Sequence, residues 1–315
     1  MKKVVLTLVW LLALVGLSYG EPVRIAYLQS DIHHLPCWVA LDQGLFEKEG
    51  VKVEVAGIFK AGPELMSGFA AGALDIGFVG VAPATTAVAN KTARVVLLAQ
   101  VNTEGSAIVV KREGKIQKVA ELSGRTAAVP GHSTVQDFLF RKALSRFEVL
   151  PDQVKIMVLK PPEMIGALRT DQIDAFIAWE PYPAKAVTSQ VGRVIASSRE
   201  IWKDHPCCAL AADERFLQNH PEKAKGIVRG HVKAIEFIRQ NREEAIKVGV
   251  KYTGMDEATV RLAMENVNYT PILSVNGEKE YVEFLNKLKY IKVDDVENLV
   301  NRFMRPEMVR EIIKR

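Results

Sequence analysis

The feature that most constrains the fold is the alternation of short apolar, β-branched runs with segments of helical spacing. Such alternation is typical of parallel sheets whose strands are joined by helical crossovers. The strands are apolar over nearly their full length, as expected where helices cover both faces of a sheet. We therefore predict an α/β protein, with strands over 23–28, 51–56, 74–79, 94–101, 107–111, 125–129, 154–159, 173–179 and 194–197 and helices over 38–49, 63–72, 83–90, 133–147 and 162–170.

The chain also contains an internal repeat. Residues 63–77 (PELMSGFAAGALDIG) align without gaps with residues 162–176 (PEMIGALRTDQIDAF), so that Asp75 matches Asp174. Each copy starts with Pro-Glu, which favours a first helical turn, and then leads through a polar turn into a strand. Chance similarity between two helix–strand units would give the same pattern, and either origin predicts two similar α/β lobes.

The length of 315 residues suits two domains of ordinary size. We expect residues 21–104 to form the first part of lobe I, residues 105–200 to form lobe II, and residues 201–315 to return to lobe I. The returning segment begins with one more apolar run at 207–212 and continues with helices that have polar faces. These helices are expected to pack on lobe I and cover it.

Residues 1–20 have the pattern of a secretory signal peptide, with a basic start, an apolar run and a small or polar end. The apolar run at 4–17 is shorter than the ~20 residues of a membrane-spanning helix, although an uncleaved N-terminal helix that anchors the chain stays an alternative. We therefore predict export to the periplasm or to the outer face of the cytoplasmic membrane. Residues 1–20 contain two lysines and no acid, so removing them lowers the formal net charge from +5 to +3, which is too small to indicate nucleic-acid binding.

The three cysteines are Cys37, Cys207 and Cys208, an odd number that does not suit a disulfide framework in an exported protein. A bond between the adjacent Cys207 and Cys208 would be strained, and a bridge from Cys37 to either of them stays open. The simplest interpretation is that all three are small buried hydrophobic residues. No Cys/His spacing indicates zinc, so we expect no metal and no cofactor.

Candidate binding residues follow the predicted strands, because ligands of open α/β sheets bind outside the carboxyl ends of the strands. The segment 131–134 (GHST) runs directly into a predicted helix, whose first backbone N–H groups attract anions. The strand at 173–179 ends in Trp179, which offers a flat apolar wall, and is followed by Glu180, which offers a fixed acceptor. These segments predict a binding site rather than a purely structural edge.

Five segments together give the chain a resemblance to a known family: 33–55 (HHLPCWVALDQGLFEKEGVKVEV), 70–84 (AAGALDIGFVGVAPA), 121–134 (ELSGRTAAVPGHST), 173–182 (IDAFIAWEPY) and 205–222 (HPCCALAADERFLQNHPE). The chain resembles periplasmic solute-binding proteins of ATP-binding-cassette importers, of the nitrate/sulfonate/bicarbonate–taurine type within the NMT1/THI5-like superfamily. The likeness covers essentially all of the chain that follows the signal peptide.

The resemblance implies the two-lobed periplasmic binding protein fold of type II, with the ligand in a cleft and hinges near 103–107 and 197–206. It also implies a monomer that delivers a small molecule to a membrane permease and its ATPase, with no nucleic acid as partner. Carried over by position, the expected ligand-binding residues are His34, Pro36, Phe59, Gly80, Val81, Ala82, Asn102, His132, Ser133, Thr134, Trp179 and Glu180.

Several of these residues have a structural alternative. His34 would also suit a turn cap, and Phe59 would also suit the core. Glu180 would also satisfy backbone donors near the hinge, and Ser133 and Thr134 would serve as helix caps. A cap can fill both roles, because its helix still presents free N–H groups to a ligand.

The expected ligand is an organic anion such as an alkylsulfonate, with a heteroaromatic molecule such as a thiamine-precursor pyrimidine as the alternative. Phe59, Val81 and Trp179 suit a molecule with an apolar part better than they suit nitrate or bicarbonate. These residues would form apolar walls, whereas a small inorganic anion needs a uniformly polar pocket.

Two enzyme classes are weighed against binding. Residues 131–135 (GHSTV) resemble the nucleophile elbow of serine hydrolases, but Val135 stands where the elbow needs glycine. The pyrimidine synthase that shares the expected fold carries a cysteine-rich motif, whereas this chain has only the pair at 207–208, and export would separate the enzyme from its partners. We therefore expect no catalytic residues.

Overall fold

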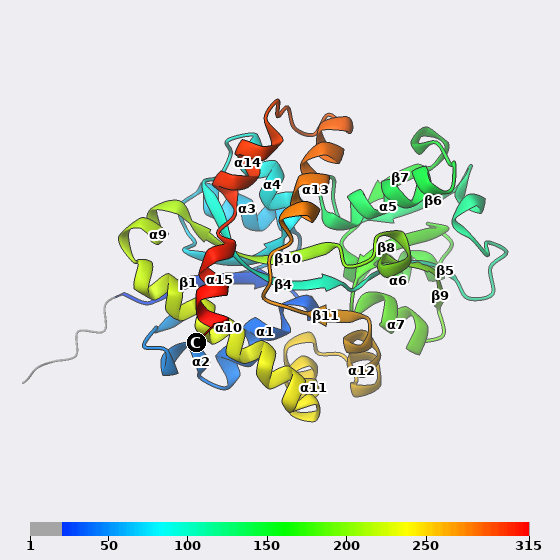
Figure 1. Ribbon diagram of the computed structural model, residues 1–315. Helices are drawn as coiled ribbons and strands as arrows, with labels where there is room; N and C mark the ends of the chain where they lie inside the picture. The colour runs from blue at the N-terminus through cyan, green and yellow to red at the C-terminus, as the bar shows by residue number, and fades with distance from the viewer. Residues whose placement is uncertain (1–20, 315) are drawn as a thin grey trace, which may run out of the picture.

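The computed structural model describes residues 21–314, so the predicted signal peptide at 1–20 lies outside the described residues. Two β-sheets lie side by side, and helices cover both of them (Figure 1). We call the six-stranded sheet with its helices lobe I, and the five-stranded sheet with its helices lobe II. The two-lobed α/β architecture predicted from the sequence is confirmed.

Lobe I is built on a mixed sheet with the strand order β11-β4-β10-β3-β1-β2. β1 pairs in parallel with β2 and β3, whereas β10 runs antiparallel to β3 and β4. β11 closes one edge as an antiparallel partner of β4. The strands are β1 (Val23–Leu28), β2 (Val53–Phe59), β3 (Ile76–Gly80), β4 (Val95–Glu104), β10 (Pro206–Asp213) and β11 (Val267–Tyr269).

Lobe II has the strand order β7-β6-β8-β5-β9. β6 pairs in parallel with β7 and β8, and β5 runs antiparallel to β8 and β9. The strands are β5 (Ser106–Lys111), β6 (Thr126–Val129), β7 (Lys155–Val158), β8 (Ala175–Trp179) and β9 (Gly192–Ser197).

Helices cover both faces of the lobe I sheet (Figure 1). One face carries α3 (Gly62–Ala70), α4 (Val81–Ala89), α13 (Val275–Lys287) and α14 (Val296–Phe303), and the other carries α1 (Leu35–Asp42), α2 (Leu45–Lys48), α10 (Pro221–Gln240) and α11 (Arg242–Thr253). The remaining elements of this lobe are η1 (Ile32–His34), α9 (Glu214–Asn219) and α15 (Pro306–Ile313).

In lobe II, α5 packs against α8, and α6 packs against α7. α12 comes from the C-terminal part of the chain but packs against α7, so that part of the chain touches both lobes. These helices are α5 (Val135–Arg146), α6 (Pro161–Arg169), α7 (Tyr182–Thr188), α8 (Ser198–Ile201) and α12 (Glu257–Glu265), with the short turns η2 (Val119–Leu122) and η3 (Pro151–Gln153). None of the helices described over 21–314 combines the length and the apolar character that crossing a bilayer requires.

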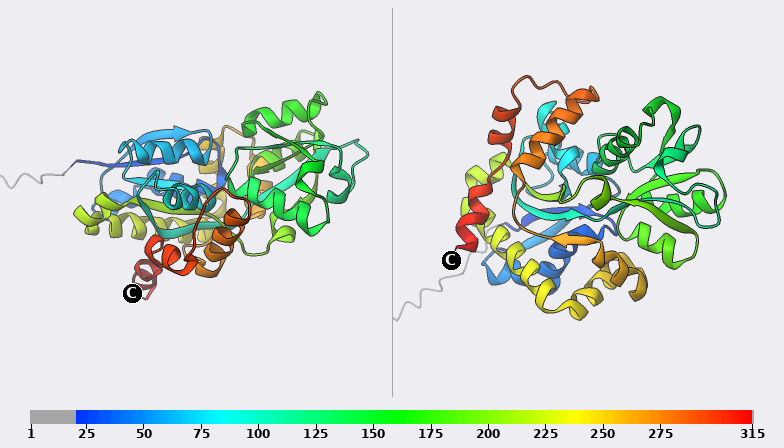
Figure 2. Two further views of the ribbon diagram at one scale, coloured as in Figure 1. Left: turned by 90° about the horizontal axis from the view of Figure 1, so that it is seen from above. Right: turned by 45° about the vertical axis from the view of Figure 1, so that its right-hand side comes forward.

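The sheets differ from the sequence-based expectation because they are mixed rather than parallel. The parallel pairs are those joined by helical crossovers, as predicted. The antiparallel strands β4, β5 and β10 carry the chain from one lobe to the other and back (Figure 2). The helix predicted over 38–49 is two helices, because Gly44 adopts a left-handed conformation with φ of +61° and ends the first of them.

The sequence repeat has a structural counterpart. Asp75 accepts a hydrogen bond from the backbone N–H of Arg24 on β1, with an N···O distance of 2.8 Å. Asp174 accepts the corresponding bond from Thr126 on β6, at 2.9 Å. In both lobes the aspartate at the start of a strand therefore ties that strand to its parallel neighbour.

The crossover between β4 and β5 turns at Gly105, which has φ of +86°. A Cβ atom added there would lie 2.2 Å from Nε2 of His33, so only glycine fits. The second crossover includes α8, and Glu104 joins the two crossovers by accepting hydrogen bonds from Nε of Arg199 at 2.6 Å and from the backbone N–H of Asp204 at 3.1 Å.

We predict that Glu278→Gln flattens the pH dependence of stability. Burial raises the pKa of Glu278 to about 7, although a hydrogen bond from Thr85 lowers it. The group therefore stabilises the fold fully below its ordinary pKa of 4.5, and this contribution is lost as the pH rises through 7. Between pH 5 and pH 8 the free energy of unfolding should fall by up to about 3 kcal/mol more in the unchanged protein than in the variant.

Urea denaturation at several pH values measures this difference. Other buried acids titrate in both proteins, so the difference between the two curves isolates Glu278. Parallel curves over this pH range would contradict the prediction.

Candidate functional site

A small cavity lies between the two lobes. Its volume, taken as the space open to the centres of water molecules, is about 10 Å³, which is room for about one water. The lobes are therefore closed over it, and a larger ligand requires them to separate. Lobe I contributes Leu28, Asp31, Gly62, Gly80, Pro83, Cys207 and Cys208 to the wall, and lobe II contributes Thr134, Val135, Gln136 and Trp179.

Three helices begin at this cavity. α3 starts at Gly62, Gly80 is the N-cap of α4, and Thr134 is the N-cap of α5. The first N–H groups of a helix have no partner within the helix, and the helix dipole adds positive potential at that end. No Lys or Arg lines the cavity. The backbone therefore supplies the positive potential that would attract a negatively charged group.

Trp179 lines the cavity from the lobe II side. Its side chain is 2% exposed and contacts the edge of Tyr182. The indole Nε1 is buried without a hydrogen-bond partner. An unpaired buried donor is costly, so this N–H favours a ligand that accepts a hydrogen bond.

Of the twelve residues predicted from the sequence, Gly80, Thr134 and Trp179 line the cavity. Val81 and Ala82 form the first turn of α4, where their N–H groups lack an intrahelical partner and their side chains are buried. The structure thus brings these five residues together around the cavity or at a helix end that faces it.

Residues of the loop before α5 line two different cavities, the interlobe cavity and a separate hollow. Thr134 caps α5 by accepting a hydrogen bond from Asp137 N–H at 3.1 Å. His132 and Ser133 instead line a separate hollow of about 200 Å³ beside α3 and α4. The backbone N–H of Ser133 is already bonded to the carboxylate of Asp137 at 3.1 Å.

The remaining predicted residues do not line the cavity, and two of them use their polar groups within the protein. The amide of Asn102 accepts from Cys208 N–H at 3.2 Å and donates to the carbonyl of Glu104 at 3.0 Å. Glu180 accepts from Ala184 N–H at 3.0 Å and from the Asn266 amide at 2.7 Å, and its burial raises its pKa to about 7. These contacts match the structural alternative for Glu180.

Three further predicted residues pack against the protein itself. Pro36 lies in the buried first turn of α1. Phe59 is half-buried, and its ring lies where side chains at Gly57 and Gly68 would collide with it. His34 is fully buried, and its Nδ1 accepts the Leu28 N–H at 3.0 Å, so it holds the end of β1.

Sequence reasoning missed Asp31, Gln136, Cys207 and Cys208. Asp31 stands in the segment that follows β1, so the rule that ligands bind outside the carboxyl ends of strands, called the strand-end rule below, could have found it. The cysteines lie at the start of β10, and the rule searches only strand ends. Because β10 is antiparallel to its neighbours, its first residues reach the edge where the other strands finish.

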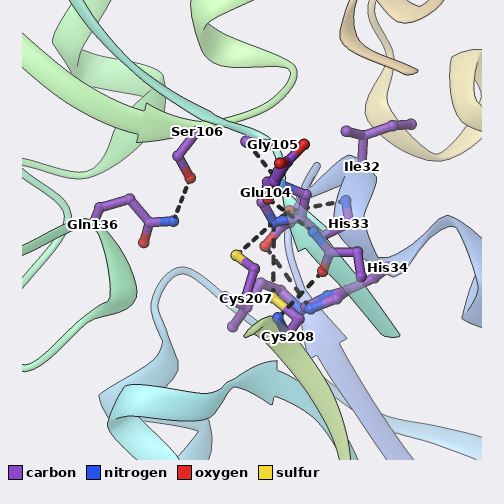
Figure 3. A network of polar contacts seen from close by, with 12 residues as sticks. Ile32, His33, His34, Glu104, Gly105, Ser106, Gln136, Cys207 and Cys208 are labelled. Carbon is purple, nitrogen blue, oxygen red and sulfur yellow. Dashed lines mark hydrogen bonds and ion pairs between the residues drawn. The ribbon is translucent and has the colours of Figure 1, made fainter. Parts of the chain in front are cut away.

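Asp31, His33 and His34 form a buried polar cluster with the two cysteines. Figure 3 shows the two histidines and the two cysteines of this cluster. Burial raises the pKa of Asp31 to about 7, and the nearby His33 opposes this. Burial lowers the pKa of His33, but Cys207 and Asp31 outweigh it and raise that pKa to about 9. Burial lowers the pKa of His34 to about 3, so this ring is neutral at physiological pH.

Comparison with known proteins places this architecture among binding proteins. The model of the NMT1-like family matches residues 20–251. The chain is 27% identical over 279 residues to a Bacillus subtilis (strain 168) protein named for binding aliphatic sulfonates, and the match covers 84% of this chain and 82% of that protein. It is 29% identical over 202 residues to the taurine-binding periplasmic protein of Escherichia coli (strain K12), covering 63% and 62%.

Among solved structures, the alkanesulfonate-binding protein SsuA of Xanthomonas axonopodis pv. citri has a TM-score of 0.79 at 18% identity. That match covers 91% of this chain and 99% of the other. At this identity the likeness establishes the fold alone. The family match and the fold together lead to one conclusion: the chain belongs to the NMT1-like family and has the two-lobed fold of periplasmic binding proteins.

Proposed function

We propose that this protein is the solute-binding component of an ATP-binding-cassette importer and that it captures a small organic anion, such as an alkylsulfonate, by closing its two lobes. It would work in the periplasm or at the outer face of the cytoplasmic membrane and deliver the solute to a permease and its ATPase. The observation that carries the proposal is the convergence of three helix N-termini on one interlobe cavity. The relatives described above are named as binding proteins.

Helix ends and the indole supply the contacts that an anion needs. The N–H groups at the start of α3, α4 and α5 would surround the charged group, and the Trp179 N–H would add a donor from lobe II. Leu28, Pro83 and Val135 add apolar wall area for a carbon skeleton. This mixture favours an organic anion over a small inorganic one.

A heteroaromatic solute, such as a pyrimidine, is the second candidate, and Asp31 is the observation that favours it. Asp31 lines the cavity. An ionised Asp31 would repel an anion but would accept hydrogen bonds from ring or amino N–H groups. The face of Trp179 would then stack on the ring.

Closure would take place about the two crossovers that join the lobes. Gly105 and Glu104 both have positive φ, so the first crossover holds an unusual backbone conformation between two strands. Glu104 fixes the second crossover through Arg199. A solute would stabilise the closed arrangement by the difference between its affinities for the closed and open forms.

Thermal denaturation of the purified protein with a panel of solutes tests the proposal. The panel contains alkylsulfonates, taurine, nitrate, bicarbonate, thiamine-pathway pyrimidines and riboflavin. A solute at 100 times its dissociation constant should stabilise the protein by about 2.7 kcal/mol. A shift with sulfonates supports the anion, whereas a shift with pyrimidines alone supports the second candidate. If no solute in the panel changes the melting temperature, the proposed solute classes are wrong.

We predict that Trp179→Phe weakens anion binding about 10- to 100-fold. The variant keeps a flat apolar ring but loses the N–H, and a hydrogen bond to a charged acceptor contributes about 1.5–3 kcal/mol. Trp179→Ala should weaken binding further, because it also removes the wall. Calorimetric titration with the solute identified in the screen measures both.

Trp202→Phe is the matched control, because that indole packs against Phe138 and Tyr281 and does not line the cavity. Its affinity should stay within about twofold of the unchanged protein. Unchanged affinity in Trp179→Phe would show that the indole is a wall only. Unfolding of Trp179→Ala would show that it is a core residue.

We predict that Glu64→Gln weakens solute binding two- to fivefold at low salt. Lys160, the N-cap residue of α6 in lobe II, forms an ion pair with Glu64 of α3 in lobe I. Because this pair joins the two lobes, we expect it to form only when the lobes are closed. Both side chains are partly exposed, so the pair contributes less than about 1 kcal/mol and is screened by salt. The two proteins should therefore have equal affinities at high salt.

Asp171→Asn controls for the loss of an ion pair that does not span the lobes, because Asp171 pairs with Lys111 within lobe II. Affinity is measured at two salt concentrations for all three proteins. Equal weakening in both variants, or none in Glu64→Gln, would mean that the Glu64–Lys160 pair does not bias closure.

A further inference from the structure

Four side chains with metal-binding atoms meet in lobe I beside the cavity. Asp31, Cys207 and Cys208 line the cavity, and Figure 3 shows His33 next to the two cysteines. His33 Nδ1 lies 3.6 Å from Cys207 Sγ, 3.8 Å from Cys208 Sγ and 3.2 Å from Asp31 Oδ1. The ligand atoms of His33, Cys207 and Cys208 all lie within 4.8 Å of one another. Each of the four side chains is at most 3% exposed, so the cluster is a built feature of the interior.

The ring of His33 is held in the orientation that a metal ligand needs. Its Nε2–H donates to the carbonyl of Gly105 at 2.7 Å. Nδ1 faces both sulfurs and the Asp31 carboxylate, and a metal ion would bind there by displacing the proton that the raised pKa of His33 keeps on the ring. A histidine that ligates a metal typically donates its other N–H to a carbonyl or carboxylate in this way.

The separations from His33 approach those of a tetrahedral site. With zinc bonds of about 2.0–2.1 Å to nitrogen or oxygen and about 2.3 Å to sulfur, neighbouring ligand atoms lie about 3.5 Å apart for N and S and about 3.3 Å apart for N and O. The observed separations of 3.6, 3.8 and 3.2 Å differ from these values by only a few tenths of an ångström. All three separations involve Nδ1 of His33, so this atom is placed for an ion, and a ligand oxygen of Asp31 lies within 4.8 Å of Cys208 Sγ.

The two adjacent cysteines can face one ion because β10 is irregular at this point. Neighbouring residues of a regular strand point to opposite faces of the sheet. The pairing of β10 with β4 shifts register on both sides of Cys208. Such a bulge turns a side chain out of its regular direction, and both thiols are free rather than joined to each other.

His34 supports the cluster rather than ligating. Its Nδ1 accepts the N–H of Leu28, so the neutral ring carries its proton on Nε2. That Nε2 is buried without a hydrogen-bond partner and lies 3.8 Å from Oδ2 of Asp31. At 3.8 Å these two atoms form no hydrogen bond, although potential ligand atoms of Asp31, His34 and Cys208 all lie within 4.8 Å of one another as a second group.

We propose that Asp31, His33, Cys207 and Cys208 bind one thiophilic divalent cation, with Zn²⁺ as the best fit to two sulfurs, one imidazole and one carboxylate. Mg²⁺ and Ca²⁺ prefer oxygen ligands and do not suit this donor set. All four residues belong to lobe I, so the site does not depend on lobe closure or on the identity of the solute. Binding would release the thiol protons, so the ion with two thiolates and one carboxylate would have a net negative charge and would not replace the Lys or Arg that the cavity wall lacks.

Metal titration of the purified full protein tests the site. The protein is reduced with a phosphine, freed of metal with a chelator, and titrated with Zn²⁺ against a chromophoric competitor. We expect one ion per chain with a dissociation constant below about 1 µM. Co²⁺ bound to the unchanged protein should give the intense thiolate-to-metal absorption of tetrahedral sulfur coordination. Absence of both signals would overturn the proposal.

Cys207→Ser/Cys208→Ser should abolish the cobalt absorption and weaken Zn²⁺ binding at least 100-fold. Asp31→Asn should weaken it about 10- to 100-fold while the cobalt–sulfur absorption persists. Cys37→Ser is the matched control, because Cys37 is a free, buried cysteine in α1 that belongs to neither group of candidate ligands, and it should bind like the unchanged protein. Equal loss in Cys37→Ser, or none in the double variant, would overturn the proposal.

The solute screen is run on metal-free and metal-loaded protein, so the two proposals fail separately. Solute binding without metal binding would overturn only the metal site. One bound ion per chain with no response to any solute would leave the metal site standing and overturn the solute classes.

Discussion

The arrangement of the interlobe cavity depends on the carbonyl oxygen of Gly105. It accepts the Nε2–H of His33 from the loop after β1 and the backbone N–H of Glu180 from the end of β8, at 2.7 and 2.8 Å. One atom at the crossover thus links a site segment of lobe I to a site segment of lobe II. A side chain at residue 105 would occupy the place of the His33 ring, so the left-handed glycine and the buried histidine require each other.

The return strand β10 determines which side chains line the lobe I wall of the cavity. It runs antiparallel between β3 and β4, so its first residues rather than its last reach the cavity edge. This places two thiols beside the aspartate and the histidines that follow β1. The wall of lobe I is therefore chemically distinct from that of lobe II, which offers an indole, a helix end and an amide.

Charge in the cavity comes from helix ends and from the buried Asp31, because no Lys or Arg side chain lines the cavity. Helix ends supply positive potential on one side, and Asp31 supplies a carboxyl group on the other. These two features favour different solutes, an anion or a molecule with N–H donors. A divalent cation bound at Asp31, His33 and the cysteines would hold the carboxylate as a ligand, so Asp31 would no longer be free to accept hydrogen bonds from a solute.

The sequence by itself determined the fold class, the repeat and three of the eleven residues that line the cavity. Apolar runs that alternate with helical spacing require covered sheets, and Gly80, Thr134 and Trp179 follow predicted strands, so local pattern and the strand-end rule were sufficient for them. Asn102 and Phe59 satisfied the same rule, but only the tertiary structure shows that their side chains are used within the protein. Only the tertiary structure brought Asp31 and His33 to Cys207 and Cys208, because about 170 residues of chain separate the two pairs. The direction of β10 decides which of its ends meets the cavity, and local sequence does not encode strand direction.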